Sequence, residues 1–312
     1  MILSITEKNI LFTISYFDVF DYPMTSFEVW RYLFCQKTSL LNIMTTLDEL
    51  IRKGKIEMKN GFYFLPERSN LVNLRQEKYN ISEKYWDKAI KATRILSILP
   101  FIKSVVVVNS LALFNCQEDS DIDLLIITEK SKIWTTRFLS VILMWFFGIR
   151  RYGKKIRSRI CLSLFMSEEK LNAYYTAPAG KEFFLAYWTA QNIVLLDRDG
   201  SFDRYLAENS WIRRFVPNYT KNITNYFLNF REPKLAKIFS FFIKILFGST
   251  RIENILRKAQ SQKIKKSQER LGNPSNVVYD DYLLKFHIHG WKRENSRDWG
   301  KLAKSLDLEW PY

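Results

Sequence analysis

Two apolar runs near the middle of the chain constrain its fold more than any other feature. The first is Val105–Val108 and the second is Ile122–Ile127, which only Asp123 interrupts. Short runs of β-branched and aliphatic residues are typical of strands buried on both faces of a sheet. Because helical patterns precede and follow these runs, we expect a fold of the α+β class, in which a mixed sheet is flanked by helices.

Polar residues gather where the first run ends and the second begins. Asn109 and Ser110 follow Val108 directly, and Asp121 and Asp123 lie at the start of the second run. Since side chains alternate between the two faces of a strand, the aspartates share one face, roughly 7 Å apart along the chain. Two carboxylates in this arrangement suit a divalent cation such as Mg²⁺, which prefers oxygen ligands.

The Ser110 turn, the Asp-x-Asp of Asp121 and Asp123, and the ten residues between Ser110 and Asp121 resemble the minimal members of the polymerase-beta-type nucleotidyltransferase superfamily. The resemblance implies that Asn109 and Ser110 hold the triphosphate of a nucleotide and that Asp121 and Asp123 are the catalytic metal ligands. It also implies Mg²⁺ or Mn²⁺ as the cofactor and ATP or another nucleoside triphosphate as the substrate. We expect the family's core fold over residues 101–200.

Three differences from the family pattern bear on activity. Asn109 stands where the family has glycine, and Phe114 stands where a second glycine is common. Glycine permits a positive φ, which asparagine tolerates and phenylalanine does not adopt readily. A later strand, expected at Arg159–Met166, carries no carboxylate, although active members usually place a third one there. The candidates to replace it from a loop are Glu168, Glu169, Asp197 and Asp199.

Residues 1–66 have the pattern of a winged helix-turn-helix. We expect helices over Ile10–Phe20, Phe27–Phe34 and Leu40–Arg52, and then a hairpin over Ile56–Leu65 with Asn-Gly at its turn. Such modules often bind DNA through the third helix. The segment contains seven basic and seven acidic residues, so it lacks the positive charge that phosphate contacts require. We therefore expect a protein-contact or structural role, with DNA binding as the alternative.

Outside the N-terminal and central segments, the sequence has two further regions. Residues 67–100 are expected to form a helical linker with a break at Tyr79–Ser82, and residues 201–312 a basic, mainly helical C-terminal region. The longest apolar runs are Phe138–Ile149 and Ile238–Phe247. Both are shorter than the roughly 20 residues of a membrane-spanning helix, so we expect no transmembrane segment. They are expected to be core helices, or at most helices that lie on the surface.

The net charge of +16 includes two dense basic clusters. Arg150–Arg159 holds six basic residues in ten, and Arg257–Arg270 holds six against the single Glu269. Clustered positive charge attracts polyanions, so any nucleic acid is expected to bind through these two clusters. The alternative is a solvated basic surface. Three scattered cysteines without metal-ligand spacing, and an amino terminus unlike a signal peptide, favour a cytoplasmic protein.

These features favour an enzyme that transfers a nucleoside monophosphate from a nucleoside triphosphate to a hydroxyl of a protein, an RNA or a small molecule. The sequence does not identify the acceptor. The alternative is a catalytically degenerate nucleotide-binding regulator, in which the winged helix contacts DNA or a partner. Ser110 with the two aspartates favours the enzyme, whereas the missing third carboxylate favours the regulator. A third hypothesis is association with a membrane surface through the apolar runs and the basic clusters.

Overall fold

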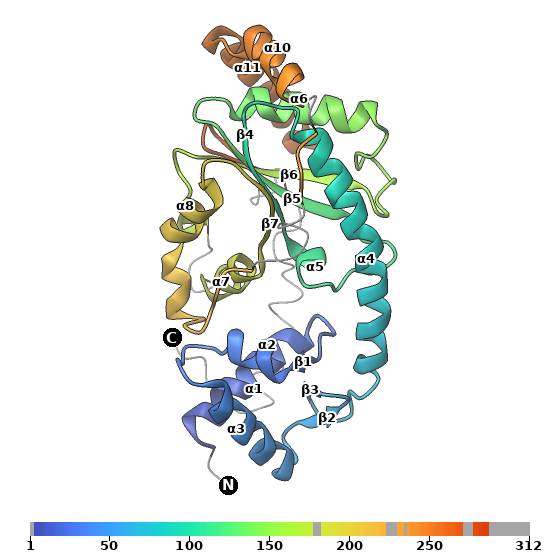
Figure 1. Cartoon of the computed structure of the whole chain (residues 1–312), viewed down its shortest axis with the longest axis vertical. Helices are drawn as coiled ribbons and strands as arrows, with labels where there is room; N and C mark the ends of the chain where they lie inside the picture. The colour runs from blue at the N-terminus through green and yellow to red at the C-terminus, as the bar shows by residue number, and fades with distance from the viewer. Residues whose placement is uncertain (1–2, 177–181, 223–229, 234–235, 271–276, 287–312) are drawn as a thin grey trace.

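The computed structural model describes residues 3–176, 182–222, 230–233, 236–270 and 277–286. Helices and two separate sheets make up these residues, which confirms the expected α+β class. A small sheet and three helices lie at one end of the elongated molecule, and the larger sheet lies toward the other end (Figure 1).

The N-terminal unit contains the three helices and the hairpin that the sequence predicts, together with one further strand. In chain order its elements are α1 (Ile5–Asp18), β1 (Met24–Thr25), α2 (Ser26–Arg31), α3 (Leu40–Arg52), β2 (Glu57–Lys59) and β3 (Phe62–Phe64). The strands are antiparallel in the order β1-β3-β2. Asn60 and Gly61 both have positive φ, as a tight hairpin turn requires. The expected helix over Phe27–Phe34 begins one residue earlier, because Thr25 forms the capping box with Glu28, and it ends at Arg31.

The core of this unit continues into a helix from the middle of the chain, α7 (Glu182–Gln191). Tyr187 of α7 stacks on Tyr16 of α1 with ring centroids 4.2 Å apart. Its hydroxyl donates a hydrogen bond to the Tyr32 carbonyl at 3.0 Å. Residues from the two segments are buried in one continuous cluster. The first helices and α7 therefore pack as a single body.

A single helix, α4 (Leu71–Leu96), connects the N-terminal unit to the larger sheet (Figure 1). The predicted break at Tyr79–Ser82 is wrong. Ser82 is buried in the helix, where its hydroxyl donates to the Lys78 carbonyl at 2.7 Å and accepts from the Cys116 N–H at 3.1 Å. Its polar group is satisfied without a break, because a serine hydroxyl can bond the carbonyl of the preceding helical turn.

The larger sheet is mixed and has the strand order β7-β4-β5-β6-β9-β8. Its strands are β4 (Ile102–Val107), β5 (Ile122–Thr128), β6 (Ile160–Ser167), β7 (Ile193–Asp197), β8 (Val278–Tyr279) and β9 (Leu283–Lys285). The two apolar runs form β4 and β5, which pair antiparallel at the centre, and β6 runs parallel to β5. As the sequence predicts, both faces of β4 and β5 are buried.

Helices cover the two faces of this sheet. Val105 and Leu124 pack with Trp86 of α4 on one face, and Val106 and Leu125 pack in a second cluster on the other. The sheet is contacted directly by α5 (Asn109–Ala112), α6 (Ile133–Phe146) and α8 (Ser201–Glu208), and α11 (Thr250–Arg270) packs on α6. Helix α10 (Ala236–Phe247) lies beside α11 at the end of the molecule (Figure 1). Short 3-10 turns lie at Tyr174–Thr176 and Ser210–Arg214. Within the described ranges no helix is both long and apolar enough to cross a bilayer.

Candidate functional site

The residues that the sequence singles out come together where β4 ends and β5 begins. The Val108 N–H donates to the Asp123 carbonyl at 3.2 Å, so the pairing of the two strands continues up to the turn. The Asn109 side-chain amide then donates to Asp123 Oδ2 at 2.7 Å. The turn after β4 and the carboxylates of β5 are therefore joined directly.

The turn has left-handed backbone at both positions where glycine would be expected. The φ angle is 60° at Asn109 and 53° at Phe114. The amide of Asn109 is oriented by Trp188, whose indole N–H donates to Asn109 Oδ1 at 2.7 Å. The Phe114 ring stacks on Tyr79 and Trp86 of α4, with centroids 5.3 Å and 5.5 Å apart. Contrary to expectation, phenylalanine adopts the glycine-like conformation here, because aromatic packing offsets its strain.

Ser110 lies at the start of α5, directly after the turn, and is half-buried. Its hydroxyl is 3.6 Å from the Cys116 sulfur, and its carbonyl accepts from the Asn115 N–H at 2.9 Å. Burial raises the pKa of the Cys116 thiol, which therefore stays protonated. Among the described residues, the Ser110 hydroxyl thus has a weak partner, the Cys116 sulfur, and a phosphate oxygen would be a stronger one.

Asp121 and Asp123 lie on one face, as predicted, and Cys161 of β6 joins them. Side-chain ligand atoms of all three residues lie within 4.8 Å of one another. Cys161 is the register partner of Asp123 in the parallel pair β5 and β6. It therefore lies beside the acidic pair, on the strand that carries no carboxylate. The alternation of residues in β6 separates its two faces, but the sequence does not say which face meets the aspartates.

Arg151 brings a positive charge to the same site, which sequence reasoning missed. Its guanidinium forms an ion pair with Asp121 Oδ2 and donates to the Cys161 sulfur at 3.8 Å. Burial opposes its charge, but the Asp121 carboxylate raises the pKa of Arg151 above its usual value. Arg151 belongs to the basic cluster Arg150–Arg159. The Ser158 N–H donates to the Ser120 carbonyl at 2.7 Å, which holds this cluster against the start of β5.

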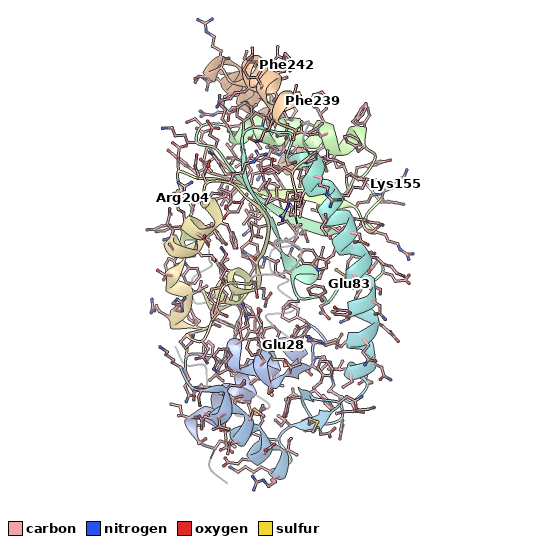
Figure 2. The ribbon with its side chains drawn as sticks, in the orientation of Figure 1. Glu28, Glu83, Lys155, Arg204, Phe239 and Phe242 are labelled. Atoms are coloured by element: carbon pink, nitrogen blue, oxygen red, sulfur yellow. The ribbon has the colours of Figure 1, made fainter. Side chains whose placement is uncertain are left out.

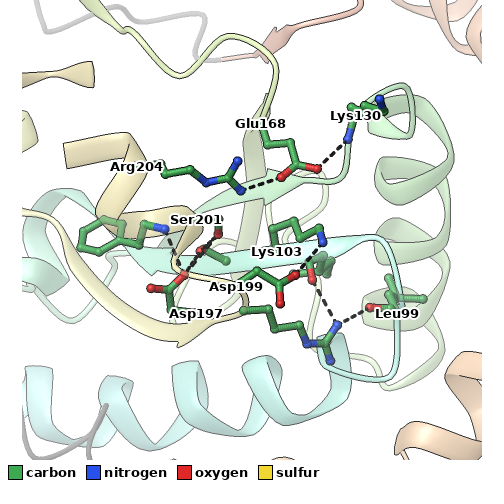
Figure 3. Close-up of polar contacts among 12 residues, drawn as sticks. Leu99, Lys103, Lys130, Glu168, Asp197, Asp199, Ser201 and Arg204 are labelled. Atoms are coloured by element: carbon green, nitrogen blue, oxygen red, sulfur yellow. Dashed lines mark hydrogen bonds and ion pairs between the residues drawn. The ribbon is translucent and has the colours of Figure 1, made fainter. Parts of the chain in front are cut away.

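The four carboxylates proposed as replacements have other partners, and Figure 3 shows those of Glu168, Asp197 and Asp199. Asp197 accepts from Ser104 and from the Phe202 N–H, Asp199 pairs with Lys103, Glu168 pairs with Arg204, and Glu169 accepts from the Ser131 N–H. Ser104 is near the beginning of β4 and Thr128, bonded to the Glu168 N–H, ends β5. All four are therefore at the opposite end of these strands from Asp121 and Asp123, and none completes the site.

The chain was compared with family models, with curated proteins and with solved structures, and none of them matches it. The functional interpretation consequently rests on the geometry of this site.

Proposed function

We propose that this chain is a metal-dependent nucleotidyltransferase, which transfers a nucleoside monophosphate from ATP or another nucleoside triphosphate to a hydroxyl group. The observation that carries the proposal is the hydrogen bond from the Asn109 side chain to Asp123, because it joins the turn to the acidic pair. Acceptors consistent with the proposal are a protein, an RNA or a small molecule. A cytoplasmic location is part of the proposal, since nucleoside triphosphates are made and used there.

The donor atoms present fit a hard divalent cation. Asp121 and Asp123 offer carboxylate oxygens from one face, and one or two carboxylates with phosphate oxygens and water are the usual set for Mg²⁺. Cys161 adds a thiol, a softer donor that Mg²⁺ does not require. When bound, the cation would neutralise charge on the triphosphate and favour attack at its α-phosphorus.

The protein's own groups would position the triphosphate. The left-handed turn at Asn109 places Ser110 at the start of α5, beside the acidic pair, where its hydroxyl would donate to a phosphate oxygen. The basic cluster Arg150–Arg159 lies beside Asp121 and would balance the negative charge of the nucleotide or of a nucleic-acid acceptor. In the transfer, the acceptor oxygen bonds to the α-phosphorus. The bond between the α-phosphorus and the oxygen that bridges it to the β-phosphorus breaks, and pyrophosphate leaves.

Ser110→Ala is expected to weaken triphosphate binding by roughly 1–2 kcal/mol, the scale of one hydrogen bond to a charged group. The measurement is equilibrium binding of a nonhydrolysable nucleoside triphosphate in the presence of Mg²⁺. Ser120→Ala is the control, because Ser120 is a nearby serine whose hydroxyl accepts from the Gln117 N–H instead. Unchanged affinity in Ser110→Ala would mean that this hydroxyl does not contact phosphate.

A nucleotide-binding regulator without transferase activity is the second candidate, and Arg151 favours it. Its guanidinium sits against Asp121, where it provides the positive charge that a cation would otherwise supply. Cys161 stands in place of a third carboxylate, so the described residues offer no further acidic group there to accept the proton of the attacking hydroxyl. In this candidate the N-terminal unit would contact DNA or a partner, and nucleotide binding would regulate that contact.

The variant Arg151→Gln distinguishes the two candidates. In the enzyme, Mg²⁺ competes with Arg151 for Asp121, so the variant is expected to bind Mg²⁺ severalfold more tightly and nucleotide binding should vanish in EDTA. In the regulator, the wild type binds nucleotide equally with Mg²⁺ or EDTA, and the variant binds about 10-fold more weakly in both. Arg157→Gln is the matched control, since Arg157 belongs to the same cluster but pairs with Glu118.

A further inference from the structure

Helix α10 exposes most of its apolar side chains to solvent. It contacts the rest of the protein through one stripe, Ala236, Ser240, Ile243 and Phe247, and Ser240 donates a hydrogen bond to the Ile98 carbonyl at 2.7 Å. The remaining large apolar residues are between 53% and 64% exposed: Ile238, Phe239, Phe241, Phe242, Ile245 and Leu246. Figure 2 shows Phe239 and Phe242 at the end of the molecule formed by α10 and α11.

The exposed residues form one continuous face. At about 100° per residue, they span the side of the helix that points away from the buried stripe. Lys237 and Lys244 are seven residues apart and lie along one margin of this face. A helix with this apolar face, lysines at its edge and a length of about 18 Å matches a helix that lies in a membrane interface, and it is too short to span a bilayer.

The surrounding charge is almost entirely positive. From Ala236 to Arg270 the sequence has nine basic and two acidic residues. One of the acids, Glu253, is buried, where it accepts from the N–H groups of Trp134 and Thr135 at 2.9 Å. Glu269 is therefore the single exposed acid in these two helices, against basic residues that are all exposed.

We propose that α10 docks on the surface of an anionic phospholipid membrane, with its apolar face among the acyl chains and the basic residues of α10 and α11 near the headgroups. Apolar burial and attraction to anionic lipid act together in such binding. A second copy of this chain is a poorer occupant, because apposing two such helices would also bring two basic surfaces together. The proposal is independent of the transferase site, because it rests only on residues of α10 and α11.

The test is sedimentation of the full chain with vesicles. The wild type is expected to bind vesicles of 70% phosphatidylcholine and 30% phosphatidylglycerol, and to bind phosphatidylcholine alone at least about 10-fold more weakly. Phe239→Gln with Phe242→Gln and Ile245→Gln should weaken binding about 30-fold or more, since three apolar side chains that the membrane would bury are lost. Lys237→Gln with Lys244→Gln should weaken it about 10-fold and reduce its sensitivity to salt.

The control variant carries Ile5→Gln, Leu41→Gln and Met58→Gln, three exposed apolar residues of the N-terminal unit, and should bind as the wild type does. Glutamine keeps helix propensity high, and circular dichroism checks the fold. Absence of vesicle binding by the wild type, or equal binding to both vesicle types, would overturn the proposal. So would a concentration-dependent dimer that the α10 variant abolishes while vesicles remain unbound, because a second copy would then be the occupant. If the triple α10 variant misfolds, the variant Lys237→Gln with Lys244→Gln tests the proposal in its place.

Discussion

Replacing Asp121 and Asp123 with asparagine is expected to abolish Mg²⁺-dependent nucleotide binding and to lower transferase activity by about 100-fold or more. Asparagine keeps the size of each side chain but removes the negative charge that a cation requires. Each single variant should show most of the loss, because both carboxylates face one position. The measurements are equilibrium nucleotide binding with Mg²⁺ and transfer of label from a nucleoside triphosphate to an acceptor.

Asp119→Asn is the matched control for this experiment. Asp119 is an exposed aspartate two residues before Asp121, so its loss changes the net charge as much as either single variant does, without altering the acidic pair. Equal nucleotide binding by the wild type and by the Asp121→Asn, Asp123→Asn protein would contradict the proposed function. A common melting temperature would establish that the variants differ in the site and not in the fold.

Tyr187→Ala is expected to lower the free energy of unfolding by about 3–5 kcal/mol, the scale for removing a large aromatic side chain from a core. Tyr187 is fully buried, stacks on Tyr16 and donates to the Tyr32 carbonyl. Burial raises its pKa well above the usual value, so the hydroxyl remains a donor. Urea denaturation followed by circular dichroism and by tryptophan fluorescence measures the change.

The conservative variant separates packing from hydrogen bonding. Tyr187→Phe keeps the ring and should cost only about 1 kcal/mol, because one buried hydrogen bond is lost. Both probes should report one shared transition in every variant, since α7 and the N-terminal helices share a core. Two separate transitions, with only one of them displaced by Tyr187→Ala, would show that the N-terminal unit folds independently.

Local patterns in the sequence predict most of the elements. The β4 and β5 strands, the hairpin at Asn60 and the helix α3 follow from apolar runs, turn residues and a cap at Ser39, all of which act over a few residues. The buried side of α3 is predicted less accurately, since the apolar pattern indicates a core stripe of Leu40, Ile43, Met44, Leu47 and Ile51. Met44 is 45% exposed and Thr46 is buried, because the neighbouring elements determine which side of the helix is covered.

In the candidate site, too, some features follow from local sequence and others depend on the tertiary structure. Asp121 and Asp123 are two residues apart in one strand, so their shared face follows from the sequence. Their neighbours Cys161 and Arg151 are distant in the chain. The parallel pairing of β5 with β6 brings in Cys161, and the Arg151 N–H donates to the Ile160 carbonyl at the start of β6. No local pattern records that pairing. The same pairing shows that Glu168 lies at the other end of the strands, and the pairing of β4 with β7 shows it for Asp197.

The sequence by itself determined the class of the fold, the two central strands and the acidic pair, because each depends on the alternation and hydrophobicity of adjacent residues. The tertiary structure alone decided the partners of that pair and the environment of each helix. Helix α10 illustrates the reason: its sequence is apolar on nearly every side, as in a buried helix, yet only the stripe containing Ser240 and Ile243 is covered. Burial depends on which distant segments pack against a helix, and no local pattern contains that information.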